Sequence, residues 1–335
     1  MPKDTATAPA PRPAGKVRNV ALVGHAGSGK TTLAEALLVA TGALPRAGRV
    51  EDGTTCLDTE DVEVRQQRSV SLGVATVEHD GHKITLLDTP GSPDFVGELR
   101  AGLRAADAAL FVVSAVNGVD ATTVQLWEEC AAVGMPRAVV ITQLDRARAD
   151  VDDAVRTCQR MLGEGVYPVH LLDRGPDGSV RGVVSLLEPD AAAPDADRLR
   201  SELIEGIIGE SEDEALMERY LAGDQLVQDD LLSDLETAVA RAHFHPVLLA
   251  APLSGVGIDS LLGLMVAGFP CPTEHGCPAV TRPDGSAAPP LTCDPDGPLV
   301  AEVVKTTTDP YLGRVSLVRV FSGSLTPDIP VHVSG

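Results

Sequence analysis

The residues with the clearest chemical potential form an octapeptide, GHAGSGKT, at positions 24–31. This octapeptide fits the pattern of a phosphate-binding loop, in which glycines let backbone amides approach phosphate groups. The Lys30 ammonium would reach the β- and γ-phosphates, and the Thr31 hydroxyl would bind Mg²⁺. A nucleoside triphosphate is therefore the expected ligand. Its expected contacts in this stretch are Gly24, His25, Ala26, Gly27, Ser28, Gly29, Lys30, Thr31 and Thr32.

A carboxylate follows a second apolar segment. Asp88 ends the sequence KITLLD and is followed by Thr89, Pro90 and Gly91. Asp88 could hold Mg²⁺ through a water molecule, and the Gly91 amide could contact a γ-phosphate. The octapeptide alone fits a kinase, a transport ATPase or a GTPase, but the sequence DTPG in this place favours a GTPase.

A third polar group, Gln143-Leu144-Asp145, follows the apolar segment AVVIT. The Asp145 carboxylate could accept hydrogen bonds from the N1 and exocyclic amino donors of guanine, a donor pair that adenine lacks. An aspartate after a strand can also simply cap a helix. With Asp145 on the base, the predicted ligands are GTP or GDP with Mg²⁺.

Alternating strand and helix patterns must bring these three groups together. They predict an α/β fold with a mainly parallel sheet and helices on both faces, and the ligand at the carboxyl ends of the strands. The expected strands are 18–23, 71–78, 83–87, 108–113, 137–142 and 246–251, and the expected helices are 30–40, 94–105, 119–133 and 258–265. The polar stretch 41–68 has little periodicity, and its length suggests a functional loop.

The amino-acid composition limits which partners the chain could bind and in which cellular compartment it would function. A net charge of −21 at pH 7 with 3% aromatic residues argues against a protein that coats nucleic acid, so no sequence-specific nucleic-acid partner is expected. Neither a signal peptide nor a membrane-spanning segment is expected. The six cysteines lack a disulfide-framework spacing, which favours the cytoplasm. Cys271, His275 and Cys277 lie close in sequence, but their spacing matches no common zinc pattern.

The chain divides into segments of different composition. The predicted segments are a disordered tail at 1–16, a nucleotide-binding domain at 17–268, a Pro- and Gly-rich linker at 269–297, and the start of a β-barrel at 298–335. The last segment has expected strands at 299–306 and 313–321 and is too short to complete a barrel, which suggests a fragment.

An acidic helical insertion interrupts the nucleotide-binding domain at about 160–245. Residues 188–236 carry sixteen Asp and Glu against three Arg, with apolar residues at helical spacing. Such a charge run either forms a solvated helical face or meets a basic partner surface.

With these groups in order, residues 17–335 resemble the translational GTPases, most closely bacterial elongation factor G and elongation factor G-like proteins. The matching segments include DTPGSPDFVGELRAGLRAADAALFVVSAVNGV and VVKTTTDPYLGRVSLVRVFSG. The resemblance implies a P-loop GTPase domain with an inserted acidic subdomain, a first switch at 46–71, a second switch at 88–104, and then the start of a β-barrel domain. It also implies a monomer that acts on the ribosome at the factor-binding site, with the acidic insertion on the stalk protein.

Several positions depart from the family pattern. Ser92 follows Gly91 where the family has a histidine that orients the attacking water, so the expected catalytic positions are Lys30, Gly91 and Ser92. Ser71 replaces the first-switch threonine and keeps the hydroxyl that would bind Mg²⁺. Gly27 replaces the aspartate of the phosphate loop.

The base-binding positions also depart from the pattern. Thr142 and Gln143 replace the asparagine and lysine that contact guanine in the family. Ala251 is followed by Pro252, which has no amide hydrogen to donate to the base.

These departures leave three hypotheses. The first is a GTPase of elongation factor G type that serves elongation or translocation. The second is a ribosome-associated regulator that binds GTP and hydrolyses little or none of it. The third is a ribosome-protection or release-type translational GTPase.

Overall fold

The structure is a computed structural model that describes residues 12–188, 195–211, 213–224, 226, 228–282, 284–309, 311 and 313–333. Residues 1–11 of the predicted tail lie outside this set. Its last residues form a short 3-10 helix, η1 (Ala14–Lys16), directly before the first strand.

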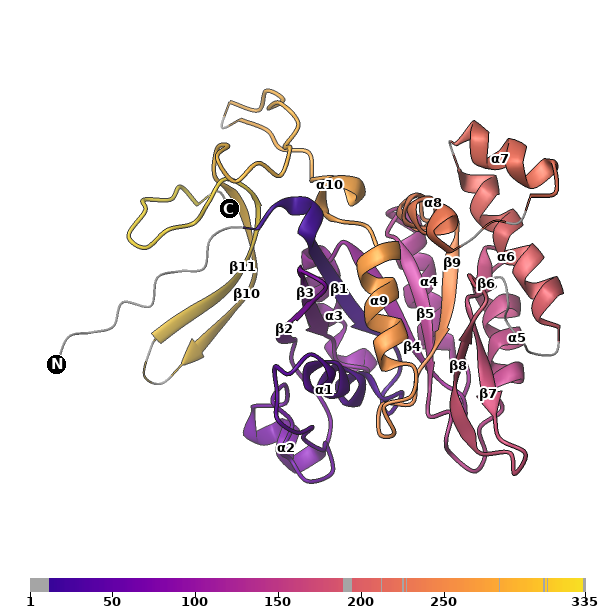
Figure 1. Cartoon of the computed structure of the whole chain (residues 1–335). Helices are drawn as coiled ribbons and strands as arrows, with labels where there is room; N and C mark the ends of the chain where they lie inside the picture. The colour runs from indigo at the N-terminus through magenta and orange to yellow at the C-terminus, as the bar shows by residue number, and fades with distance from the viewer. Residues whose placement is uncertain are drawn as a thin grey trace.

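A seven-stranded sheet forms the centre of the molecule (Figure 1), with the strand order β2-β3-β1-β4-β5-β9-β6. All neighbouring strands are parallel except β2 and β3, which form an antiparallel hairpin. The strands are β1 (Val17–Val23), β2 (Gly73–His79), β3 (His82–Asp88), β4 (Ala108–Ser114), β5 (Arg137–Thr142), β6 (Val166–Pro168) and β9 (His245–Leu249). Two further antiparallel hairpins are β7 (His170–Arg174) with β8 (Val180–Ser185), and β10 (Val300–Asp309) with β11 (Gly313–Ser322).

Helices cover both faces of the sheet. One face carries α1 (Lys30–Ala40), α6 (Ala196–Glu210), α8 (Gln228–Ala240) and α9 (Ile258–Gly268), and the other carries α3 (Val96–Ala105), α4 (Ala121–Ala132) and α5 (Val151–Leu162). Strands β4 and β5 are buried at every position because apolar side chains pack on both of their faces. The shorter helices are α2 (Asp61–Gln66), η2 (Pro93–Phe95), α7 (Glu214–Leu221) and α10 (Pro272–His275).

The predicted fold class is confirmed. Sequence analysis missed α2, α5 and the strands β6 to β8. Helix α2 has only six residues and no long apolar stripe. Helix α5 could have been found, because Val151, Ala154, Cys158 and Leu162 recur at helical spacing and are all buried.

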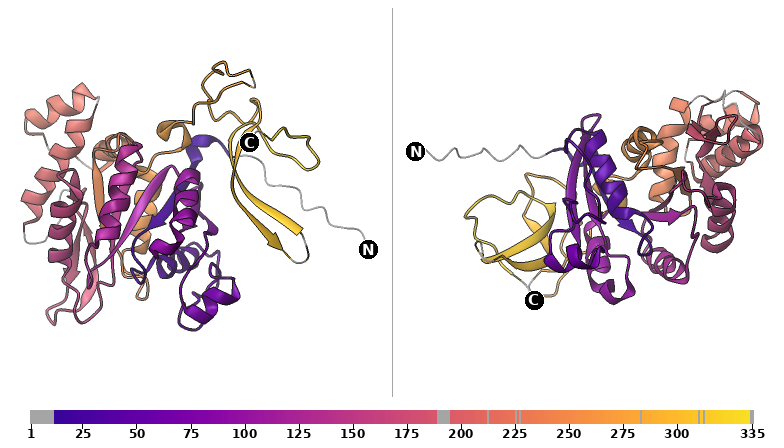
Figure 2. Two further views of the ribbon diagram at one scale, coloured as in Figure 1. Left: turned by 180° about the vertical axis from the view of Figure 1, so that it is seen from behind. Right: turned by 90° about the horizontal axis from the view of Figure 1, so that it is seen from below.

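The acidic helices and the C-terminal hairpin lie at opposite ends of the sheet (Figures 1 and 2). Helices α6 and α7 lie at the β6 end, whereas the hairpin β10–β11 packs beside α3. The Lys305 ammonium lies 2.7 Å from the Glu98 carboxylate of α3, and the Arg319 guanidinium lies 2.7 Å from the buried Asp107 carboxylate. In the described part of the chain, no helix is both long enough and apolar enough to cross a bilayer.

One core contact offers a test of how the sheet is stabilised. Phe111 of β4 is fully buried and meets Trp127 of α4 edge to face, with 4.9 Å between the ring centroids. Phe111→Ala should lower the free energy of unfolding by about 3 to 5 kcal/mol, because it opens a cavity and removes the ring contact. Urea denaturation measures this loss. Val133→Ala is the control and should change stability by less than about 0.5 kcal/mol, since Val133 is 73% exposed. A similar loss in both variants would contradict this account of the core.

Candidate functional site

The parallel strands carry the predicted polar groups to one edge of the sheet. Leu22 of β1 pairs with Asp88 of β3, and Ser114 of β4 pairs with Thr142 of β5. Parallel strands end at the same edge, so the phosphate loop after Val23 begins beside Asp88 and near Thr142. This is the carboxyl edge at which the sequence predicted the ligand.

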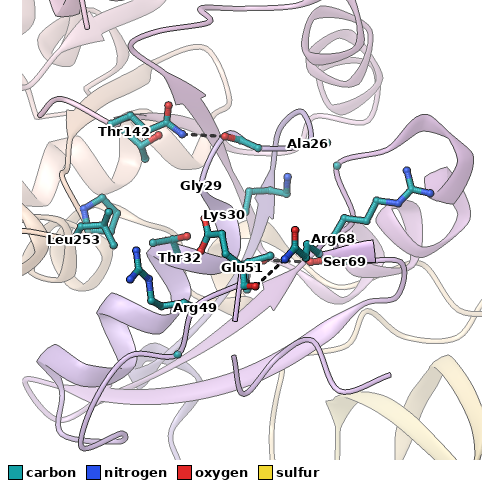
Figure 3. Close-up of a pocket in the computed structure, with 18 of the residues that line it drawn as sticks. Ala26, Gly29, Lys30, Thr32, Arg49, Glu51, Arg68, Ser69, Thr142 and Leu253 are labelled. Atoms are coloured by element: carbon teal, nitrogen blue, oxygen red, sulfur yellow. Dashed lines mark hydrogen bonds between the residues drawn. The ribbon is translucent and has the colours of Figure 1, made fainter. Parts of the chain in front are cut away.

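A cavity of about 300 Å³ opens at this edge (Figure 3). The predicted residues that line it are Ala26, Gly27, Gly29, Lys30, Thr31, Thr32, Gly91, Ser92, Thr142, Gln143 and Asp145. The lining residues that sequence analysis did not assign to the site are Gly48, Arg49, Val50, Glu51, Gln67, Arg68, Ser69, Arg146, Pro252 and Leu253. Seven of these lie in the segment 48–69. This segment is polar and has little periodicity, so its sequence did not indicate which of its residues would reach the cavity.

The phosphate loop folds tightly around the Lys30 side chain. The buried Lys30 ammonium donates hydrogen bonds to the carbonyl oxygens of Gly24 (2.8 Å) and His25 (3.0 Å). A Cβ atom on Gly24 would lie 2.4 Å from the Val112 carbonyl oxygen, so a side chain at this position would push the loop off the sheet. Burial lowers the pKa of Lys30 to about 8, although the nearby Asp88 carboxylate acts to raise it.

Thr31 and Asp88, the two residues that the sequence predicted at a cation, are hydrogen-bonded to each other. The Thr31 hydroxyl donates to the Asp88 Oδ2 atom at 2.7 Å, and Asp88 is only 2% exposed. Burial raises the pKa of Asp88 to about 6, while Lys30 and the Thr31 hydroxyl act to lower it. The Asp88 Oδ1 atom is buried and has no hydrogen-bond partner among the described residues. A hydroxyl and a carboxylate with one unsatisfied oxygen fit a hard divalent cation such as Mg²⁺.

In the segment predicted as the first switch, Ser69 rather than Ser71 reaches Thr31. The Ser69 and Thr31 hydroxyl oxygens lie 3.2 Å apart, and Ser69 also donates to the Asp58 carboxylate at 2.6 Å. Ser71 instead contacts the buried Glu63 carboxylate through both its amide and its hydroxyl. The role of Ser71 at the cation therefore stays a prediction.

The segment predicted as the second switch passes close to the phosphate loop. A Cβ atom on Gly91 would lie 2.6 Å from the Lys30 ammonium and from the Ala26 amide nitrogen, so only glycine fits this crossing. The Ser92 hydroxyl lines the cavity and lies 3.2 Å from the Asp94 carboxylate. A serine hydroxyl in this place is shorter than an imidazole and has no comparable basicity.

At the far end of the cavity, Thr142 and Gln143 support the phosphate loop. The Thr142 hydroxyl donates to the Ser28 carbonyl oxygen at 2.7 Å, and the Gln143 amide donates to the Gly27 carbonyl oxygen at 2.9 Å. The exposed Asp145 lines the cavity beyond them. These contacts give Thr142 and Gln143 a role in positioning the loop that sequence analysis did not predict.

Some of the predicted residues are not among those that line the cavity. Gly24, His25, Ser28, Ser71 and Asp88 do not line the cavity itself. Ala251 does not line it either.

The loop after β9 shows why Ala251 lies outside the cavity. Ala251 is buried, and its amide donates to the Val256 carbonyl oxygen at 2.8 Å. The next two residues, Pro252 and Leu253, line the cavity instead.

Comparison with known proteins agrees with this geometry. The sequence profile described as Elongation factor Tu GTP binding domain matches residues 15–271, which is more than half of the chain. The chain belongs to this family of GTP-binding domains. A GTP-binding domain implies a guanine nucleotide as the ligand, as the sequence predicted.

Individual relatives confirm the resemblance to proteins of elongation factor G type. The elongation factor G-like proteins of Mycobacterium tuberculosis strains CDC 1551 / Oshkosh and ATCC 25618 / H37Rv are each 53% identical to the chain over 346 residues. These alignments cover 98% of this chain and 48% of each relative. A crystal structure of a Thermus thermophilus protein matches with a TM-score of 0.80 and 36% identity, over 93% of this chain and 46% of the other. The chain thus spans about half the length of the relatives that it matches.

The cysteine and histidine residues near the linker have separate partners. The Cys271 sulfur contacts the Thr273 hydroxyl, the Cys277 sulfur lies 3.1 Å from the Cys293 sulfur, and His275 lies near Asp107. Among the described residues, no group of three or more His, Cys, Asp or Glu side chains could hold a metal ion.

The raised pKa of Asp88 predicts a pH dependence of stability. Folded Asp88 takes up a proton near pH 6, whereas the unfolded chain does so near the ordinary value of 3.8. Stability from this group is therefore greatest at low pH and is lost as the pH rises through about 6. Between about pH 5 and about pH 7.5, the nucleotide-free wild type should lose about 1 kcal/mol relative to Asp88→Asn, which stays neutral. Urea denaturation at each pH measures the difference, and parallel pH profiles would show that Asp88 does not titrate in this range.

Proposed function

We propose that this chain is the nucleotide-binding part of a translation factor of elongation factor G type. It would bind GTP with Mg²⁺ and act on the ribosome in elongation or translocation through its two switch segments. The observation that carries the proposal is the carboxyl edge of the sheet, where Lys30, Thr31 and Gly91 line the cavity and the buried Asp88 carboxylate accepts a hydrogen bond from Thr31.

Each group has a defined task in this proposal. The loop amides and Lys30 would bind the phosphates, and Thr31 and Asp88 would hold Mg²⁺, which neutralises phosphate charge. Asp145 would accept the donors of the guanine edge. Ser71 and Gly91 would sense the γ-phosphate, because ordering of both switches by that group couples nucleotide state to a partner surface.

The negative charge of the acidic insertion suggests the proposed partner. Helices α6 and α7 lie at the end of the sheet opposite the β10–β11 hairpin. Their exposed residues include several carboxylates. A basic surface such as that of the ribosomal stalk protein would be attracted to them. We propose a monomer in the cytoplasm, in accord with the charge and the cysteine usage of the chain.

A second candidate function rests on Ser92. With a hydroxyl held by Asp94 in the place of an imidazole, the chain would bind GTP and hydrolyse it slowly, as a ribosome-associated regulator. A ribosome-protection or release-type GTPase is the further alternative, since those proteins differ from elongation factor G in domains beyond the segment matched here.

Competition between nucleotides tests the ligand. Unlabelled GTP and GDP should displace a fluorescent guanine nucleotide from the chain, and ATP should not, because only guanine offers two donors to Asp145. Asp145→Asn should weaken GTP binding by about tenfold or more and improve binding of xanthosine triphosphate, whose 2-oxo group accepts from the asparagine amide. Equal displacement by ATP and GTP would rule out a guanine nucleotide site.

Single-turnover hydrolysis distinguishes the two candidate functions. Phosphate release from GTP bound to the wild-type chain, with and without intact ribosomes, gives the rate. If the missing imidazole limits the reaction, Ser92→His should raise the ribosome-stimulated rate by about tenfold or more. Ser92→Ala is the matched control and should equal the wild type. Fast wild-type hydrolysis that Ser92→Ala abolishes would instead make the serine hydroxyl a participant in the reaction.

A further inference from the structure

Arg49 places a positive charge in the cavity from the first-switch segment. It lines the cavity together with Gly48, Val50 and Glu51, in the part of the segment that precedes α2. The close-up shows its guanidinium beside Thr32, on the side that faces Leu253 (Figure 3). The Lys30 ammonium points the other way, toward Ala26.

Arg49 has no counter-charge within the described part of the chain. No ion pair and no side-chain hydrogen bond joins its guanidinium to a described residue, and only its backbone amide and carbonyl are engaged. Glu51, two residues further on, also lines the cavity but is not within ion-pair distance of Arg49. In contrast, Arg68 stacks over the Phe95 ring and donates to Gln66, and it extends away from Thr32.

A buried carboxylate fixes the backbone that carries Arg49. Glu35 of α1 is fully buried, and it accepts hydrogen bonds from the amides of Gly48 (2.7 Å) and Cys56 (2.6 Å). Thr54 closes the turn, because its hydroxyl accepts from the Arg49 amide and its amide donates to the Arg49 carbonyl oxygen. The same helix carries Thr32 in its first turn, so Arg49 and the phosphate loop share one rigid support.

We infer that Arg49 binds the nucleotide at its α-phosphate, on the ribose side of the cavity. Lys30 serves the β- and γ-phosphates at one end, and Leu253 lies at the other, where the base is expected. Asp145, the expected base contact, also lines the cavity. The guanidinium beside Thr32 lies between these ends. A free arginine fork in that place matches the geometry of phosphate oxygens, and the chain around it has a net charge of −21.

This assignment rests on the proposed function and adds to it. Both GDP and GTP have an α-phosphate, so Arg49 strengthens the binding of both nucleotides by the same factor. It therefore holds the 48–56 segment against the nucleotide in both states. The part of the first switch that responds to the γ-phosphate is then the later part, around Ser69 and Ser71.

Isothermal titration of the chain with Mg-GDP and with a non-hydrolysable Mg-GTP analogue tests the assignment. Arg49→Gln should raise both dissociation constants by about tenfold, the loss typical of one charge-assisted contact to phosphate. Arg49→Lys should restore part of the affinity, and Arg49→Gln should make binding less sensitive to salt than the wild type. The melting temperature should not change, since Arg49 is exposed.

Arg46→Gln is the matched control, because Arg46 is exposed in the same segment and does not line the cavity. It should leave both dissociation constants within about twofold of the wild type. Loss of affinity for the GTP analogue alone would move Arg49 to the γ-phosphate and overturn the assignment, as would unchanged binding in Arg49→Gln. A wild type that bound neither nucleotide would overturn the proposed function itself.

Discussion

The parallel pairing of β1 between β3 and β4 is the constraint on which the site depends. It sets Leu22 opposite Asp88, so the chain leaves β1 as the phosphate loop beside the carboxylate that ends β3. The 2.7 Å bond from Thr31 to Asp88 exists only in this register. A slip of one residue would put Leu87 or Thr89 in the place of the Asp88 carboxylate and turn the core side chains of the strand to the other face.

The apolar packing of the sheet offsets the free-energy cost of burying charged side chains at its carboxyl edge. Lys30 and Asp88 are both buried, and burial shifts their pKa values toward the neutral forms of both groups. Glu35, also buried, is compensated by two backbone amides rather than by a cation. Helices on both faces of the sheet supply the apolar burial that offsets these charges. Phosphate groups and a divalent cation are the natural counter-charges of such an edge, which makes ligand binding and stability interdependent.

A single carboxylate connects the start of β2 to the C-terminal hairpin. Glu98 of α3 accepts from the amide of Leu72, directly before β2, and from the Lys305 ammonium of β10. On the neighbouring strand, Arg319 reaches the buried Asp107, which also accepts from Asn19 of β1. A displacement of the hairpin must therefore break these charged contacts or move α3 with it. The hairpin is thus mechanically linked to the elements that surround the nucleotide cavity.

Sequence by itself determined the fold class and the central groups of the site. The octapeptide 24–31, the DTPG sequence and Asp145 each follow an apolar segment, and local pattern suffices to identify such a strand, loop and helix order. Their convergence followed from the rule that parallel strands end at one edge. Most of the predicted strands and helices agree with the structure within a few residues, because their apolar periodicity is strong.

Only the tertiary structure decided how the loops around the cavity are used. Resemblance to the family placed Ser71 at the cation, and in the structure Ser69 contacts Thr31 while the hydroxyl and amide of Ser71 contact Glu63. It also gave no sign of Arg49, whose position depends on hydrogen bonds from a turn to a buried carboxylate on another element. Such contacts join residues far apart in sequence and have no periodicity, so the local sequence pattern cannot predict them.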